Sequence, residues 1–84
     1  MLLIIRGKRE LQEQIQAAVF NIFERKAVLR VRNTTHERVE MIYEISSELL
    51  QHAERGKHSI CDEIYELGEI EYVNVVMQND EISG

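Results

Sequence analysis

The sequence predicts an α+β domain in which two helices cover one face of a four-stranded antiparallel sheet. Two kinds of hydrophobic periodicity indicate this class. Apolar residues recur at spacings of three and four in two segments, as on one face of a helix, and alternate with polar residues in others, as in a strand with one buried face. The 84 residues are 44% apolar and contain no proline, which favours one small domain with its own core.

The first two elements are a central strand and an amphipathic helix. Residues 1–7, MLLIIRG, are apolar at consecutive positions and close with Gly7, a pattern typical of a strand covered on both faces. In residues 8–24, apolar side chains at helical spacing form one stripe, and Glu and Gln residues occupy the opposite side. The stripe consists of Leu11, Ile15, Val19 and Ile22.

An antiparallel hairpin follows the helix. Residues 28–32 and 38–45 both alternate, and the polar segment NTTHE between them favours a turn. One face of the second strand carries Val39, Met41, Tyr43 and Ile45. In the first strand, we expect Leu29 and Val31 to lie on that same covered face.

The closing elements are a second helix and a last strand. Ser59 is expected to cap a helix that ends before Gly68, and residues 70–78 form the last strand. Residues 46–57 leave two interpretations open. Either Ser46 or Ser47 caps a short helix, or the preceding strand extends and passes into a loop, which is the interpretation we favour.

The order strand, helix, strand, strand, helix, strand is that of the ferredoxin-like βαββαβ sandwich, with sheet order 4-1-3-2 and both helices on one face. The other face then carries an apolar cluster, and contiguous apolar surface tends to mark an interface. The residues expected in this cluster are Leu3, Ile5, Ile42, Val76 and Val28. We therefore expect a partner there, either a second copy or another part of a longer protein.

The charges are distributed unevenly along the chain. Residues 1–38 contain eight Lys and Arg against four Asp and Glu, whereas residues 39–84 contain two against eleven. We expect the two halves to pair with each other in the fold, with Arg30 facing Glu40 or one of its neighbours across the hairpin. The net charge of −5 argues against nucleic-acid binding, because an acidic chain repels phosphates at long range.

The best candidate for an anion-binding site is a basic set beside the first edge strand. It consists of Arg25, Lys26, Arg30 and Arg32. The same charges also suit an edge strand that must avoid pairing with other chains. Both interpretations stay open at this point.

No catalytic residue, cofactor or metal site is expected. His58 and Cys61 are one helical turn apart, and His52 lies upstream, but a structural zinc site needs four ligands. The single cysteine precludes an internal disulfide and favours a reducing, cytoplasmic location. The longest apolar run, residues 1–5, is too short to span a membrane.

Two segments carry a resemblance to a known family. AVLRVRNTTHERVEMIYEI and SICDEIYELGEIEYVNVVM resemble the C-terminal soluble region of an uncharacterised family of bacterial multi-pass membrane proteins, often encoded beside polyphosphate-polymerase-like proteins. In that family a hairpin with a threonine-containing polar turn precedes a helix of the type F-I-D-E-L, and residues 60–64 stand at that position here. The resemblance implies that residues 1–84 are one domain excised from a longer membrane protein, and that it is a non-enzymatic accessory domain on the cytoplasmic side.

A looser similarity links the βαββαβ order to ACT-type regulatory domains. It implies an alternative function, in which a small-molecule effector binds at a dimer interface. The glycine expected in the effector loop of such a domain would be Gly7, between the first strand and the first helix.

Overall fold

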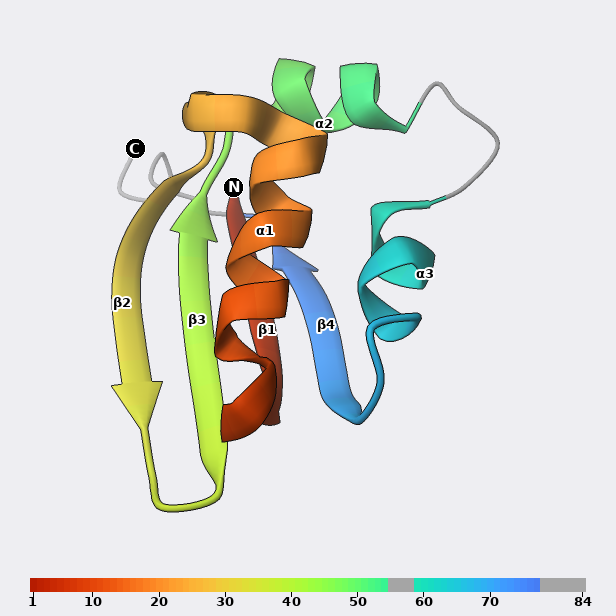
Figure 1. Cartoon of the computed structure of the whole chain (residues 1–84). Helices are drawn as coiled ribbons and strands as arrows, with labels where there is room; N and C mark the ends of the chain where they lie inside the picture. Colours follow the sequence, from red (N-terminus) through yellow and green to blue (C-terminus); the bar gives the residue numbers. More distant parts are fainter. Residues whose placement is uncertain (55–58, 78–84) are drawn as a thin grey trace.

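A computed structural model describes residues 1–54 and 59–77 and shows an α+β architecture built on one antiparallel sheet (Figure 1). The four strands are β1 (Leu2–Lys8), β2 (Val28–Thr34), β3 (Arg38–Glu44) and β4 (Ile70–Val76). They lie in the order β2-β3-β1-β4, and every neighbouring pair is antiparallel. This is the predicted order, with β1 and β3 at the centre.

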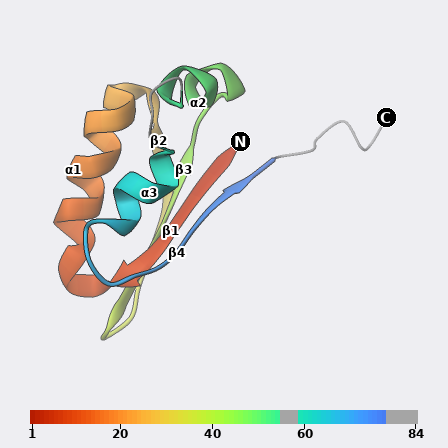
Figure 2. The ribbon, with the colours of Figure 1, turned by 90° about the vertical axis from the view of Figure 1, so that its right-hand side faces the viewer.

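The helices lie on one side of the sheet and at one of its ends. They are α1 (Gln12–Phe23), α2 (Ser47–Ala53) and α3 (Ile60–Tyr65), with short 3₁₀ turns at Arg9–Leu11 and Glu24–Lys26. Figure 2 shows α1 and α3 on the same side of the sheet, while α2 lies beyond its end. We call the face that no helix covers the open face. None of the helices in the described part of the chain has the length and apolar character that crossing a membrane requires.

The core fills the space between the sheet and these helices. Its fully buried residues come from β1, α1, β3 and α3, together with Ile45 just after β3. They are Leu3, Ile5, Ile15, Val19, Phe23, Val39, Met41, Tyr43, Ile45, Ile60 and Ile64. The predicted inward face of β3 is therefore confirmed, because strict alternation leaves only one set of side chains that can avoid water.

Two residues predicted for the open face lie in this core instead. Leu3 and Ile5 are both 0% exposed, and they pair with Tyr43 and Met41, whose side chains also point toward the helices. The physical reason is the charged residue Arg6, which shares one face of β1 with the even-numbered positions. Its guanidinium has to stay near water, so the odd-numbered residues turn inward.

The register of β2 also differs from the prediction. Leu29 pairs with Tyr43, but the pairing shifts before Val31, which lies opposite Ile42. This irregularity places one extra residue in β2, as in a β-bulge, and sends Val31 to the open face rather than to the covered face with Leu29.

Residues 47–53 form a helix, so our favoured interpretation of a strand end and loop is wrong there. The Ser46 side-chain oxygen accepts a hydrogen bond from the Leu49 backbone N–H at 3.0 Å, as an N-cap residue does. Leu49, Leu50 and Ala53 then pack, partly buried, against the core. The remainder of the ambiguous segment, residues 55–57, lies outside the described residues, as do His58 and the tail 78–84.

The second predicted helix has the expected N-cap, whereas its C-cap is Glu66, two residues before Gly68. The Ser59 side-chain oxygen accepts a hydrogen bond from the Asp62 backbone N–H at 3.2 Å, and α3 is followed by Gly68 with φ of 138°. That φ strongly favours glycine.

Gly7 lies inside β1 and is buried, so it neither closes the strand nor forms a loop before α1. A Cβ atom at this position would lie 3.0 Å from Ile70 Cδ1 and 3.1 Å from the Glu69 carbonyl oxygen. The absence of a side chain lets the irregular end of β4 approach β1 closely.

Candidate interaction surface

One half of the open face is mainly apolar. Its apolar residues lie on two neighbouring rungs, a rung being a set of neighbouring residues across the strands, and each rung also contains one polar residue, Glu44 or Asn74. We call the apolar residues the apolar patch: Leu2, Ile4, Val28, Val31, Ile42 and Val76. The three valines are 46%, 39% and 39% exposed, in the order in which they occur along the chain, and the other three residues are half-buried.

The patch contains three of the five residues predicted for it. Ile42, Val28 and Val76 lie on the open face as expected, and the register adds three that sequence reasoning missed. Leu2 and Ile4 could have been found from their spacing to Arg6, since residues two and four positions apart share a face of a strand. Val31 could not, because no feature of the sequence marks the extra residue in β2.

The other half of the open face is polar and is built around Glu40. The Tyr72 hydroxyl donates a hydrogen bond to Glu40 Oε2 at 2.6 Å, and the Asn33 side-chain amide donates one to Oε1 at 3.4 Å. The hydrogen bond from Tyr72 is the main cause that lowers the pKa of the Glu40 carboxyl, and the same bond raises the pKa of the Tyr72 phenol. The polar contact therefore links β2, β3 and β4.

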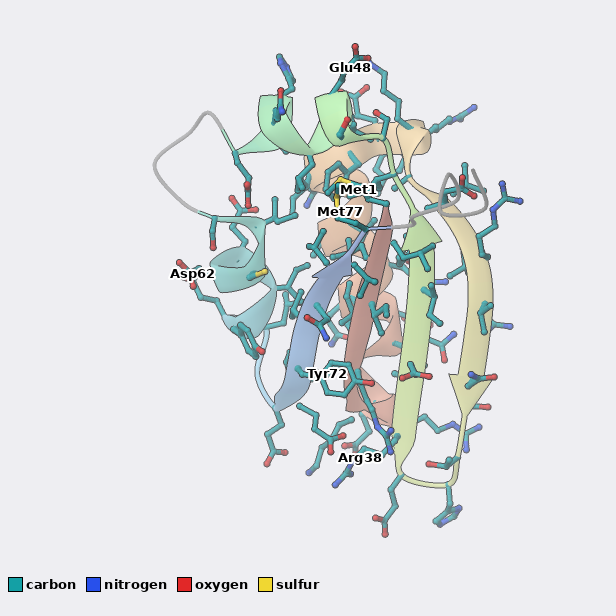
Figure 3. The ribbon with its side chains drawn as sticks, turned by 180° about the vertical axis from the view of Figure 1, so that it is seen from behind. Met1, Arg38, Glu48, Asp62, Tyr72 and Met77 are labelled. Carbon is teal, nitrogen blue, oxygen red and sulfur yellow. The ribbon has the colours of Figure 1, made fainter. Side chains whose placement is uncertain are left out.

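Ion pairs complete the polar half. Glu71 Oε1 lies 3.0 Å from Arg6 Nε and 3.5 Å from Arg38 Nε, and Lys8 Nζ lies 2.7 Å from Glu69 Oε1. The Arg6 Nε atom is shielded from water but makes no well-directed hydrogen bond, so its contact with Glu71 is ionic. Figure 3 shows Tyr72 and Arg38 near one end of this face and Met77 at the other, beyond the apolar patch.

The four residues of the predicted anion site do not converge. Arg30 Nε forms an ion pair with Glu44 Oε1 at 2.7 Å, so its partner is Glu44 rather than Glu40. Arg32 pairs in register with Met41, which places it on the side of the sheet that faces the helices. Arg25 and Lys26 lie in the 3₁₀ turn before β2. The edge strand is therefore basic on both sides, and of the four residues only Lys26 and Arg30 line a common hollow.

A surface hollow of about 720 Å³ lies where β2 and β3 meet α2. It is lined by charges of both signs and by an apolar floor: Lys26, Val28, Arg30, Glu44, Ile45, Ser46, Glu48, Leu49 and His52. Because two carboxylates share it with the cations, it does not have the uniform positive field that would select an anion.

Comparison of the chain with models of known protein families, with curated proteins and with solved structures finds no match.

The residues considered for metal binding and for an effector loop are not assembled into a site. In residues 1–54 and 59–77, no group of three or more His, Cys, Asp or Glu side chains is placed to hold a metal ion. Cys61 is half-buried, and burial raises the pKa of its thiol, helped by the negative charges of Glu54 and Asp62. Gly7 lines a surface hollow of about 310 Å³ together with Lys8, Arg38, Glu69, Ile70 and Glu71, but it does so from within β1 and not from a loop before α1.

Proposed function

We propose that this chain is a non-enzymatic interaction domain that binds a protein partner through the apolar patch of its open face. The observation that carries the proposal is the clustering of six apolar side chains on two adjacent rungs, in which only Glu44 and Asn74 are polar. Scattered apolar residues are ordinary on a surface, whereas a contiguous cluster on an otherwise uncovered sheet is typical of an interface.

The size of the patch supports a contribution large enough to drive association. Covering roughly 400 Å² of apolar surface at about 25 cal/mol per Å² yields about 10 kcal/mol before the costs of association are subtracted. Those costs are of similar size, so the patch alone favours a partner that also contacts the polar half of the face.

We further assign the fold to the ferredoxin-like βαββαβ type, with α2 inserted between β3 and α3. Its support is the strand order, the antiparallel pairing and the placement of α1 and α3 on one face. The resemblance to the soluble region of a membrane-protein family, carried by the β2–β3 hairpin and the α3–β4 unit, supports a location on the cytoplasmic side of a membrane. The partner is then a second copy or another part of that longer protein.

Site-specific photo-crosslinking in living cells tests the proposal. A photoreactive amino acid replaces Ile42 in the patch, and in a matched control it replaces Glu66, which is exposed beside α3. We expect covalent protein adducts from position 42 and none from position 66. Adducts that form equally at both positions, or at neither, would refute binding through the open face.

A further inference from the structure

The centre of the open face has a simple internal pattern. On the two middle rungs, β1 and β3 place Ile4 beside Ile42 and Arg6 beside Glu40. One rung is therefore apolar on both central strands, and the next has opposite charges on them. The strands β2 and β4 flank this pair on either side.

This pattern becomes complementary to itself under one symmetry operation. Two copies that pack these faces together are related by a two-fold axis between the sheets. If the axis runs parallel to the strands, each residue keeps its position along the strand direction, and the order of the strands is reversed. Strand β1 of one copy then lies over β3 of the partner. Ile4 then faces the partner's Ile42, and Arg6 faces the partner's Glu40. Each contact occurs twice.

We infer that the protein which covers the open face is a second copy of this chain, packed face to face about a two-fold axis parallel to the strands. The inference rests on the proposed function and identifies its partner. On the two central strands it places Ile4 against Ile42 and Arg6 against Glu40, at the centre of the face, where two twisted sheets remain best aligned.

A two-fold axis perpendicular to the strands gives a poorer match. Positions along the strand direction are then inverted between the two copies. Full overlap of the faces would therefore lay the apolar patch of one copy over Arg6, Glu40 and Tyr72 of the other. Overlap of the two patches alone would leave both polar halves uncovered. The parallel axis uses the whole face and keeps Ile4 against Ile42 and Arg6 against Glu40, although Asn74 then faces the partner's Val31.

The area of the face suits such a dimer. Four strands about 4.8 Å apart and seven residues long, at about 3.3 Å per residue, make a face of roughly 19 by 23 Å. Two faces bury at least twice this projected area, roughly 900 Å², and side-chain relief increases the value. That lies between the roughly 800 Å² below which most crystal contacts fall and the roughly 1,000 Å² that a stable interface should exceed, so the dimer is expected to be a weak one.

The outer rungs do not oppose this arrangement. Lys8 would face the partner's Arg38, but each of these cations already lies against a carboxylate of its own chain, Glu69 and Glu71 respectively. At the opposite end, on the rung that also holds Leu2, Glu44 would face the partner's Leu2, and it keeps its ion pair with Arg30, which is more than half exposed at the edge of the sheet. Both rungs lie at the rim, where charges remain near water.

Paired charge reversal tests the inference. In Arg6→Glu, carboxylates face each other across the axis, and in Glu40→Arg, guanidinium groups do, so each variant alone should dissociate at least tenfold more readily than the wild type. An equimolar mixture of the two restores attraction at both contacts of the heterodimer. Sedimentation equilibrium from 5 to 200 µM should therefore show wild-type dimers, weak self-association of each variant, and recovery in the mixture.

The mixture also separates contacts between chains from those within a chain. Both variants lose the Arg6–Glu40 neighbour pair inside their own sheet, and mixing cannot restore it. A mixture that associates no better than its components would overturn the assigned arrangement. A wild-type monomer at 200 µM would overturn the second copy itself; adducts of position 42 with a different protein would then leave the proposed function standing.

A second measurement covers the case in which a charge-reversed chain does not fold. In a Cys61→Ser background, Ile4→Cys and Ile42→Cys are prepared separately and mixed under mild oxidation. We expect several-fold more disulfide-linked dimer in the mixture than in either variant alone, because the two positions face each other across the axis. Equal yields in all three samples would overturn the inference.

Discussion

Individual side chains determine which face of each strand is exposed to water. The hydrogen bond between Tyr72 and Glu40 is the clearest polar example. The Tyr72 phenol on β4 donates a hydrogen bond to the Glu40 carboxylate on β3 at 2.6 Å, although β1 lies between these two strands in the sheet. Because the bond stabilises the ionised carboxylate, the pKa of Glu40 lies below its ordinary value. The polar half of the open face is thus held together by side chains as well as by the backbone.

Replacing Tyr72 by Phe should remove this bond together with the contact between the phenol oxygen and Arg6. We expect a loss of roughly 0.5–1 kcal/mol in the free energy of unfolding at pH 7, below the roughly 1.5–3 kcal/mol typical of a bond to a charged group, because both side chains are accessible to water. The pKa of Glu40 should move back up toward its ordinary value in an NMR titration. Since a lowered folded-state pKa stabilises the fold above the ordinary carboxyl pKa, the difference between the two proteins should shrink as the pH falls through the lowered value.

A double-mutant cycle supplies the control for this prediction. In a Glu40→Gln background the charge is already absent, so Tyr72→Phe should cost less there than in the wild type. Equal costs in both backgrounds would contradict the assigned hydrogen bond.

Two neighbouring isoleucines test the orientation of β1. Ile5 is 0% exposed in the core, whereas Ile4 is half-buried on the open face. Ile5→Ala should cost about 2–5 kcal/mol, because it removes buried surface and leaves a cavity. Ile4→Ala should cost clearly less when both are measured by urea unfolding at a protein concentration where the chain is monomeric. The reverse order would mean that the strand faces the other way.

At the scale of elements, the caps determine where the short helices begin. Helix α2 has seven residues, and the Ser46 hydroxyl oxygen satisfies one of its free N–H groups. Ser47, the next residue, is the first in the helix and is exposed. A helix of this length is marginal by itself, so the cap and the packing of its leucines have to act together.

The pair Ser46→Ala and Ser47→Ala separates these positions. We expect Ser46→Ala to cost about 1 kcal/mol and to speed amide hydrogen exchange in α2. Ser47→Ala should be neutral, since alanine is a good helix former at an exposed position. If the two substitutions had the same effect on the urea midpoint, Ser46 would not be the cap.

The secondary-structure elements also differ in how completely their own sequences determine which face is buried and where the element begins. The strict alternation in β3 predicts its buried face, because shifting it by one residue would bury Glu40 and Glu44. The consecutive apolar residues of β1 fit either face, so only Arg6 identifies the inward set. The extra residue in β2 depends on tertiary pairing, and the start of α2 depends on which of two adjacent serines caps the helix. Those two features moved Val31 into the site and gave the chain a helix where we expected a loop.

At the scale of the whole molecule, the uneven charge distribution is resolved within the fold. All four ion pairs in the described part of the chain join a cation from residues 1–38 to a carboxylate from residues 39–84. The basic first half therefore meets the acidic second half across the sheet, as the sequence predicted. Glu71 is the centre of this pairing, because one of its oxygens contacts arginines from both central strands.

Removing the charge of Glu71 should therefore have a larger effect than removing that of an isolated surface carboxylate. Glu71→Gln keeps the shape of the side chain but leaves Arg6 and Arg38 without their shared anion, so the urea midpoint should fall in low salt. Glu37→Gln is the matched control, because Glu37 is exposed in the β2–β3 turn and forms no ion pair within the described residues. The difference in urea midpoint between the two variants should narrow as sodium chloride rises to about 0.5 M, because the Debye screening length is then shorter than about 8 Å. A gap that persists unchanged at high salt would show that Glu71 stabilises the sheet through the shape of its side chain and not through its charge.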